Sequence, residues 1–149
     1  MSVSPVPAGY HTVTPYLVVP GVAGVVRFLI EAFGAELASP MATRPDGTVM
    51  HADVKLGDSH VMLGEPTPGF DAMPAMVHLY VPNVDERYAA ALRAGAVSVS
   101  EPTNHFYGDR SGGVRDASGN VWWISTRVED VSPEEIARRA AAERPAPGD

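Results

Sequence analysis

The sequence contains no cysteine and no apolar run long enough to cross a membrane. Without cysteine the chain has no disulfide, no thiol nucleophile and no thiolate ligand for zinc, so a metal site would need histidine, aspartate or glutamate. A membrane-spanning helix needs about 20 consecutive apolar residues, and no stretch of this sequence approaches that length. The N-terminal residues also lack the basic and apolar segments of a signal peptide. We therefore predict a cytoplasmic protein with no membrane partner.

Basic residues are few. The chain has 11 Lys and Arg against 18 Asp and Glu, which gives a net charge of -7. This balance argues against nucleic acid as a partner, because phosphate backbones are bound by clustered Lys and Arg. Single arginines, among them Arg27, Arg44 and Arg115, still allow a small anion to be recognised. The 149 residues are enough for one domain with its own hydrophobic core.

The chain repeats one pattern after about 60 residues. Residues 15–36 read PYLVVPGVAGVVRFLIEAFGAE and residues 78–98 read HLYVPNVDERYAAALRAGAVS. Both contain an apolar strand, a Val-Pro-x-Val break, an amphipathic helix and a Gly-Ala exit. The stretch around His60 then aligns with the stretch around Asn120, which pairs Leu63 with Trp123. Two such halves can fold around a pseudo-twofold axis, and the cleft between them is the predicted ligand site.

Each half is predicted to form a strand, a helix and three further strands. Hydrophobic periodicity and turn residues place strands at 13–19, 36–43, 49–56, 60–64, 75–81, 97–100, 109–115 and 121–126, and helices at 22–33, 84–94 and 132–142. This order predicts an α+β fold with two βαβββ modules. A single domain spans 1–149, with module one at 10–65, a linker at 66–74, module two at 75–127 and a C-terminal helix at 132–142.

Side chains alternate between the two faces of a strand, so the apolar pattern predicts which face each residue occupies. One face of the strands should lie under the helices, with Leu17, Val19, Met50, Ala52, Val54, Leu56, Val77, Leu79, Val81, Trp122 and Ile124. The opposite face should line the cleft, with Thr14, Tyr16, His51, Asp53, Met76, His78, Tyr80 and Trp123. The predicted cleft is therefore rich in aromatic rings and has two imidazoles and one carboxylate.

Four stretches resemble one known family. They are TPYLVV at 14–19, VMHADVKLGDSHVML at 49–63, HLYVPNVD at 78–85 and YGDRSGGVRDASGNVWW at 107–123. The chain resembles the vicinal oxygen chelate superfamily, which contains glyoxalase I, extradiol dioxygenases and bleomycin-resistance proteins, and it is most similar to the PhnB-like branch. The resemblance implies a cup-shaped mixed sheet with a ligand cleft, and a homodimer. It does not imply an activity, because this superfamily places enzymes and non-catalytic binders on one scaffold.

The metal enzymes of that superfamily carry ligands on the first and last strands of each module. Aligned with this sequence, the four positions fall on Thr14, Leu63, Met76 and Trp123. Leu, Met and Trp do not hold a hard divalent ion, and a lone Thr is a poor ligand. The resemblance therefore predicts that the usual metal centre is absent and that no cofactor is needed.

Three functions remain open at this point. The first is a metal-free binder of a small, partly aromatic molecule, for which the predicted ligand-binding residues are Tyr16, His51, Asp53, His78, Tyr80, Phe106, Arg110 and Trp123. The second is a metal-dependent lyase, isomerase or dioxygenase-like enzyme with a relocated site at His51, Asp53 and His78. The third is a metal-free enzyme in which His51 or His78 is the general base and Asp53 tunes it. Arg110 either binds an anionic group of the ligand or forms an ion pair that fixes the adjacent Gly112-Gly113 turn.

Overall fold

The structure is a computed structural model that describes residues 2–143. The first half contains β1 (Tyr16–Val18), α1 (Val22–Phe33), β2 (Glu36–Leu37), β3 (Ala42–Thr43), β4 (Val49–Leu56) and β5 (Ser59–Gly64). The second half contains β6 (Met76–Tyr80), α2 (Val84–Arg93), β7 (Val97–Asn104), β8 (Asp109–Arg115) and β9 (Val121–Arg127), and α3 (Pro133–Glu143) follows. No helix among these residues is long and apolar enough to cross a membrane.

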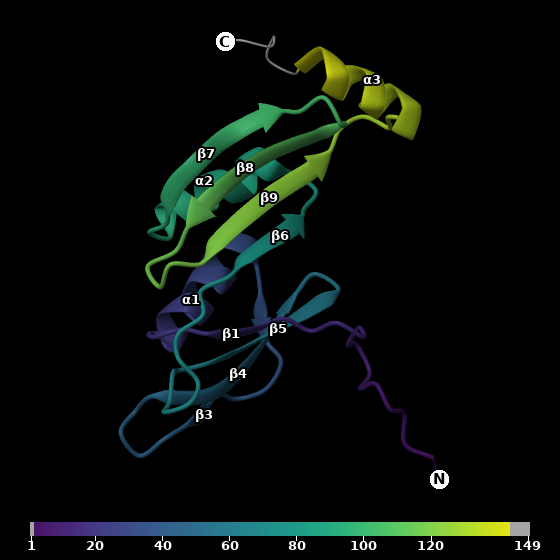
Figure 1. Cartoon of the computed structure of the whole chain (residues 1–149). Coiled ribbons are helices and arrows are strands. Elements are labelled where there is room, and N and C mark those ends of the chain that lie inside the picture. Colours follow the sequence, from purple (N-terminus) through teal and green to yellow (C-terminus); the bar gives the residue numbers. More distant parts are fainter. Residues whose placement is uncertain (1, 144–149) are drawn as a thin grey trace.

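Each half of the chain forms its own mixed sheet (Figure 1). The strand order is β1-β5-β4-β2 in the first sheet, where β3 also pairs with β4, and β6-β9-β8-β7 in the second. The opening strand of each half runs parallel to its last strand, β1 beside β5 and β6 beside β9. The hairpins β4-β5 and β8-β9 are antiparallel. The predicted α+β fold with two similar modules is confirmed.

The first helix forms because its apolar residues recur at helical spacing, and two glycines set its ends. Gly21 and Gly34 have φ angles of 74° and 68°, a left-handed conformation that strains residues with a Cβ. The helix buries one face, which includes Val22, Val25 and Leu29. The second helix begins after Asn83, whose side chain accepts a hydrogen bond from the backbone N–H of Glu86.

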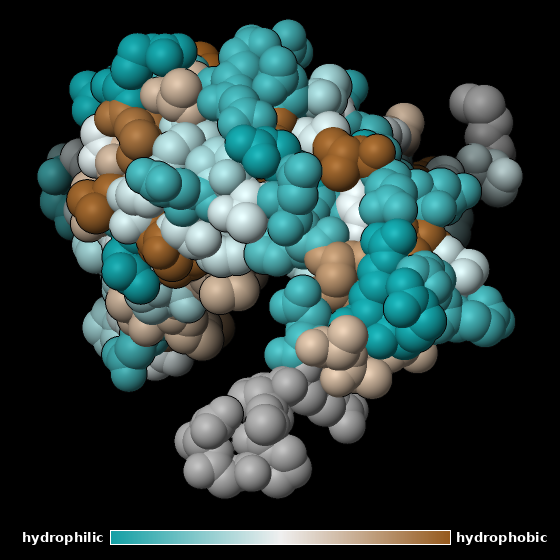
Figure 2. Space-filling view, turned by 90° about the horizontal axis from the view of Figure 1, so that it is seen from above, coloured by the Kyte–Doolittle hydropathy of each residue, from teal (hydrophilic) through white to brown (hydrophobic). Residues whose placement is uncertain are grey.

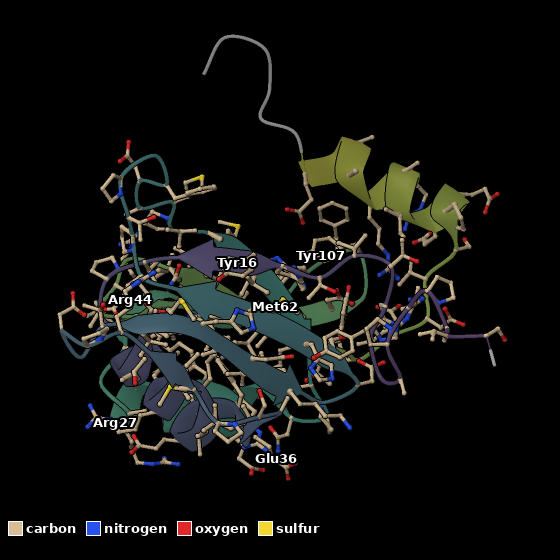
Figure 3. The ribbon with its side chains drawn as sticks, turned by 90° about the horizontal axis from the view of Figure 1, so that it is seen from below. Tyr16, Arg27, Glu36, Arg44, Met62 and Tyr107 are labelled. Atoms are coloured by element: carbon tan, nitrogen blue, oxygen red, sulfur yellow. The ribbon has the colours of Figure 1, made fainter. Side chains whose placement is uncertain are left out.

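The core joins the two modules. α1 and α2 pack against each other, and their buried residues form one cluster with Leu17, Leu63, Val114, Trp122 and Ile124 of the two sheets. Burying one such side chain fully contributes about 1.5–3 kcal/mol. Both helices lie behind the sheets in Figure 1, and Figure 3 shows them together on one side when the molecule is seen from below. We call the face of each sheet turned away from these helices the cup face.

The cup face is flanked at both ends of the molecule. The linker after β5 is tied to β1 by a hydrogen bond of 2.8 Å from the Met73 N–H to the Val18 carbonyl. α3 (yellow in Figure 1) projects on the opposite flank. Apolar and polar residues are mixed over the side shown in Figure 2. The linker and α3 thus lie at opposite ends of the cup face.

Three predicted strands differ in extent. The strand expected at 13–19 is limited to Tyr16–Val18, and the one expected at 97–100 continues to Asn104. The strand expected at 36–43 is divided into β2 and β3, and both parts pair with β4. Pro40 lies between them and has no N–H to donate to a neighbouring strand, which accounts for the interruption.

Two predicted side-chain orientations were wrong. Met50 was expected under the helices, but its side chain is 51% exposed. β3 pairs Ala42 with His51 and Thr43 with Val49, so β4 has one extra residue at Met50, a bulge that turns this side chain to the cup face. Leu63 was expected to match Trp123, but it is fully buried and lies opposite Leu17.

The position equivalent to Trp123 is Met62. Tyr16 pairs with Met62 in the first sheet as His78 pairs with Trp123 in the second. The repeat was therefore misaligned by one residue, and a shift of one residue exchanges the two faces of a strand. The other predicted orientations are confirmed for Trp122 and Ile124, both fully buried, and for Ala52 and Val54 in the core.

Candidate functional site

The cup face of the second sheet carries exposed apolar side chains around a hydrogen-bonded centre. Met76 and Tyr80 of β6 are 71% and 68% exposed. Trp123 of β9 lies over Gly113 of β8, where a Cβ would be only 2.3 Å from the indole ring. Because only glycine leaves room for the indole, the sequence at 112–113 sets the position of this ring. The centre therefore offers a broad aromatic and thioether surface.

A chain of hydrogen bonds lies beneath that surface. The Nε2 atom of His78 lies 2.8 Å from the Ser125 hydroxyl, which lies 2.6 Å from the hydroxyl of Ser111. Both serines are fully buried, whereas His78 is exposed. This arrangement holds one edge of the imidazole against the sheet. These buried serines were not identified as functional candidates from the sequence. The pairing of β9 with β6, which places Ser125 on the same face as His78, could have indicated them.

The side chain of Tyr80 on β6 is held by a hydrogen bond to β8. Its hydroxyl donates a hydrogen bond of 2.8 Å to the buried carboxylate of Asp109. The carboxylate raises the pKa of the Tyr80 hydroxyl above its ordinary value, because it accepts a hydrogen bond from the neutral hydroxyl and opposes a second negative charge. The His78 and Tyr80 rings are 5.1 Å apart. Tyr80 therefore presents the face of its ring to the cup while its hydroxyl is bonded to Asp109.

The cup face of the first sheet contains Tyr16 and His51. The Tyr16 hydroxyl lies 3.3 Å from Nδ1 of His51, and the ring centroids are 5.8 Å apart. Tyr16 is 48% exposed and lines a cavity of about 460 Å³ between β1, β4, the end of β5 and the linker. Figure 3 shows Tyr16 and Met62 on this sheet, with Arg44 to one side of them. This cavity includes one predicted ligand-binding residue, Tyr16.

Asp53 is engaged by residues that the sequence analysis did not place in the site. It accepts a hydrogen bond from the Tyr10 hydroxyl and lies 2.8 Å from Nδ1 of His60. Tyr10 stacks on His60 with centroids 3.9 Å apart, and Asp53 raises the pKa of the Tyr10 hydroxyl by accepting a hydrogen bond from it. Asp53 and His60 are nearly buried. This cluster anchors the N-terminal segment to β4 and β5, so Asp53 is not oriented toward His51.

Arg110 forms an ion pair with the start of the second helix. Its Nε and Nη2 donate hydrogen bonds of 2.9 Å to both carboxylate oxygens of Asp85, and Nη1 donates to Asn104. The guanidinium lowers the pKa of Asp85 below its ordinary value. Arg110 thus forms an ion pair, but with Asp85, and the predicted Gly112-Gly113 turn was wrong because both glycines lie within β8. Phe106 lies in the turn after β7, where its ring meets Tyr107 edge-on and its carbonyl accepts from Arg139.

The relocated metal site is not assembled within one chain. His51 and Asp53 belong to β4 of the first sheet, whereas His78 belongs to β6 of the second. Each has its own hydrogen-bond partners. His51 bonds to Tyr16, Asp53 bonds to His60 and Tyr10, and His78 bonds to Ser125. Among residues 2–143, no group of three or more His, Asp or Glu side chains could hold a metal ion. With the register corrected, the four positions that the resemblance assigned to metal ligands become Thr14, Met62, Met76 and Trp123.

A second hollow lies between the modules on the helix side. It has a volume of about 580 Å³ and is lined mainly by small residues from α1, from the loop after α2 and from the β8-β9 turn. None of the predicted cleft aromatics lines it. The aromatic residues are instead divided between the cup faces of the two sheets. The candidate site is therefore the cup face and not the hollow beside the helices.

Comparisons with known proteins agree with the fold. The family model for the Glyoxalase/Bleomycin resistance protein/Dioxygenase superfamily matches residues 10–124. The uncharacterized protein Mb0911c of Mycobacterium bovis is 33% identical over 135 residues, covering 83% of this chain and 88% of that one. The uncharacterized protein Rv0887c of Mycobacterium tuberculosis is also 33% identical over 135 residues, covering 83% and 78%.

Two solved structures show the same arrangement. TioX from Micromonospora sp. ML1 is 26% identical, with a TM-score of 0.62, over 78% of this chain and 96% of that one. Protein PA1353 from Pseudomonas aeruginosa is 19% identical, with a TM-score of 0.63, over 80% and 99%. The likeness to the PhnB-like branch stays a prediction. The match over most of the chain shows that this protein belongs to the Glyoxalase/Bleomycin resistance protein/Dioxygenase superfamily.

Proposed function

We propose that this protein binds a small, partly aromatic molecule on the cup face without the metal centre of the superfamily's enzymes. The observation that carries the proposal is the floor of the cup. Its family metal positions hold Thr14, Met62, Met76 and Trp123, and large apolar side chains stay exposed around them. Thioether, indole and hydroxyl groups do not hold a hard divalent ion, whereas exposed aromatic and thioether surfaces suit a flat apolar ligand.

A neutral aromatic probe tests this proposal. Phenylnaphthylamine fluoresces when it leaves water, so a titration reports binding to chelator-treated protein. We expect saturable binding that added Zn²⁺ or Mn²⁺ does not strengthen. Tyr16→Ala should weaken binding about tenfold, as expected for one lost aromatic stacking partner. Leu92→Ala, an exposed apolar truncation on α2, is the matched control and should bind like the wild type. Binding that is absent or that requires metal would refute the proposal.

A metal-free enzyme is the second candidate, and the bonding of His78 favours it. The Ser125 hydroxyl, which is itself bonded to Ser111, holds Nε2 of His78, so the other ring nitrogen is the one left to exchange a proton with a ligand. Turnover distinguishes the two candidates. A binder returns its ligand unchanged after prolonged incubation, whereas an enzyme converts it and loses conversion in His78→Ala while retaining affinity.

We also propose that the protein forms a homodimer. Edge strand β7 leaves Val97 69% and Val99 43% exposed, and edge strand β6 exposes Met76. Apolar residues on open sheet edges favour association with another chain. Light scattering coupled to gel filtration should give twice the mass of one chain at micromolar concentration. Val97→Lys should shift that mass toward a single chain, and an unshifted monomer mass for the wild type would contradict the proposal.

A further inference from the structure

The cavity beside Tyr16 combines an apolar lining with one cation. Met50, Phe70 and Met73 line it and are each more than half exposed, so their apolar surface is available to a ligand. The bulge in β4 is what turns Met50 into this cavity, and the hydrogen bond from Met73 to Val18 holds the linker as its wall. The linker is thus part of a binding site and not only a connection between modules.

Two charged residues, Glu65 and Arg44, reach the same cavity. Both oxygens of the Glu65 carboxylate are used by the backbone, since Oε1 accepts from the Gly21 N–H at 3.1 Å and Oε2 accepts from the Val49 N–H. These bonds fix the start of α1 to β4. Glu65 therefore has a structural role, and its charge is already stabilised by two N–H dipoles.

Arg44 is placed differently. Its Nη1 donates a hydrogen bond of 3.2 Å to the Thr48 hydroxyl, which in turn donates to Asp46 at 2.6 Å. Among residues 2–143, no carboxylate lies within 4.0 Å of the Arg44 guanidinium, unlike those of Arg110 and Arg139. Its side chain is only partly exposed. A guanidinium has five N–H donors, so most of its capacity to bind an oxyanion is unused by the chain.

From this geometry we propose that the ligand of the cavity is an amphipathic anion, with an apolar or aromatic body and one carboxylate, sulfonate or phosphate group bound by Arg44. This inference rests on the proposed function and specifies its ligand class. The body contacts Tyr16, Met50 and Phe70, and the oxyanion accepts the free N–H donors of Arg44. In a chain with a net charge of -7, attraction of an anion must come from such a local cation.

Two probes that share one ring system separate the charge from the body. Anilinonaphthalene sulfonate is phenylnaphthylamine with an added sulfonate, so the ratio of their Kd values reports recognition of the anion. The wild type should bind the sulfonate more tightly than the neutral probe. Arg44→Gln should weaken sulfonate binding about tenfold, as expected for one charge-assisted hydrogen-bonded pair, and leave the neutral probe unchanged. Arg27→Gln removes the same charge from the side of the molecule that carries the helices, away from Arg44, and should alter the Kd of neither probe (Figure 3).

Further variants locate the probes. Phe70→Ala at the exposed linker tip should weaken both probes without a change in melting temperature. Gly64→Ala should also weaken both probes, but with a fall in melting temperature, because a Cβ there would be 2.7 Å from the Tyr16 hydroxyl and 2.8 Å from the Met50 backbone carbonyl. Gly24→Ala is its matched control, since a Cβ at Gly24 meets nothing within 4 Å.

The outcomes distinguish this inference from the proposed function. If Arg44→Gln leaves the sulfonate affinity intact, or weakens both probes equally, the assignment of Arg44 is overturned while metal-free binding stands. The same holds if Phe70→Ala leaves both affinities unchanged, because the probes then bind elsewhere on the cup. If the wild type binds neither probe, the proposed function and this inference both fail.

Discussion

Replacing Trp122 by Phe tests the packing that separates the core from the cup face. The Trp122 ring is fully buried, lies 6.0 Å from the Phe33 ring of α1, and donates from Nε1 to Asp116 at 2.8 Å. Asp116 is itself buried and also accepts hydrogen bonds from Ser118 and Asn120. The Trp122 side chain therefore connects β9, α1 and the β8-β9 turn.

The cost follows from two losses. Removing a hydrogen bond to a buried carboxylate costs about 1.5–3 kcal/mol. The smaller phenyl ring also leaves a cavity, at about 24 cal/mol for each Å³ that the surroundings do not fill, or about 1 kcal/mol. We expect a total near 3 kcal/mol, which for a chain of this size lowers Tm by about 6–12 °C.

Trp123→Phe is the matched control, because it makes the same chemical change on the next residue. Trp123 lies on the cup face over Gly113, so the change should cost less than about 1 kcal/mol and should remove most of the ligand-dependent fluorescence change. Urea unfolding followed by circular dichroism measures both variants. A small effect at Trp122 with a large one at Trp123 would show that β9 is displaced by one residue and would refute the assignment of the two faces.

Three further predictions concern other contacts. His78→Ala should weaken ligand binding by about 1–3 kcal/mol with little change in Tm, because it leaves a polar partner of the ligand unpaired; calorimetry and a melting curve check this, and a large fall in Tm with unchanged binding would place His78 in the folding core instead. Tyr10→Phe removes the hydroxyl that donates to Asp53, so residues 2–12 should be cleaved faster by protease while the sheets resist; an unchanged cleavage rate would contradict this anchor. The Arg138 and Arg139 guanidinium groups lower the pKa of Glu135 from 4.5 to about 2. Because the folded pKa is the lower one, this stabilisation is present above about pH 4.5 and is lost as the pH falls toward 2. NMR signals of α3 should shift in that window in the wild type and not in Glu135→Gln, and identical titrations of both proteins would count against these contacts.

Periodic patterns predicted most of the fold. The bounds of α1, β4 and β8 agree with the sequence prediction, because Val22–Phe33 has strong helical periodicity and glycine turns delimit the strands. The repeat predicted the two modules. It could not predict the bulge at Met50, since an extra residue in one strand depends on how β3 pairs with β4 and leaves no periodic signal.

The site was harder to predict because its contacts cross between strands. Asp53 was predicted to line the cleft beside His51, but it is buried, and its partners His60 and Tyr10 come from the neighbouring strand and the N-terminal segment. The two-residue turn Gly57-Asp58 fixes the β4-β5 register, and that register places His60 diagonally beside Asp53, so this pair was within reach of sequence reasoning. Arg44 could be noted as a lone cation, but its position in a cavity depends on the path of the linker.

Elemental analysis of the purified protein, combined with a probe-binding titration, tests the central claim most directly. Protein purified without chelator should contain no stoichiometric Fe, Zn, Mn or Ni, and phenylnaphthylamine should bind it with the same Kd before and after treatment with EDTA. A metal content near one ion per chain that falls in both His51→Ala and His78→Ala, together with loss of probe binding, would contradict the account and would place a metal site across the two sheets or across two chains.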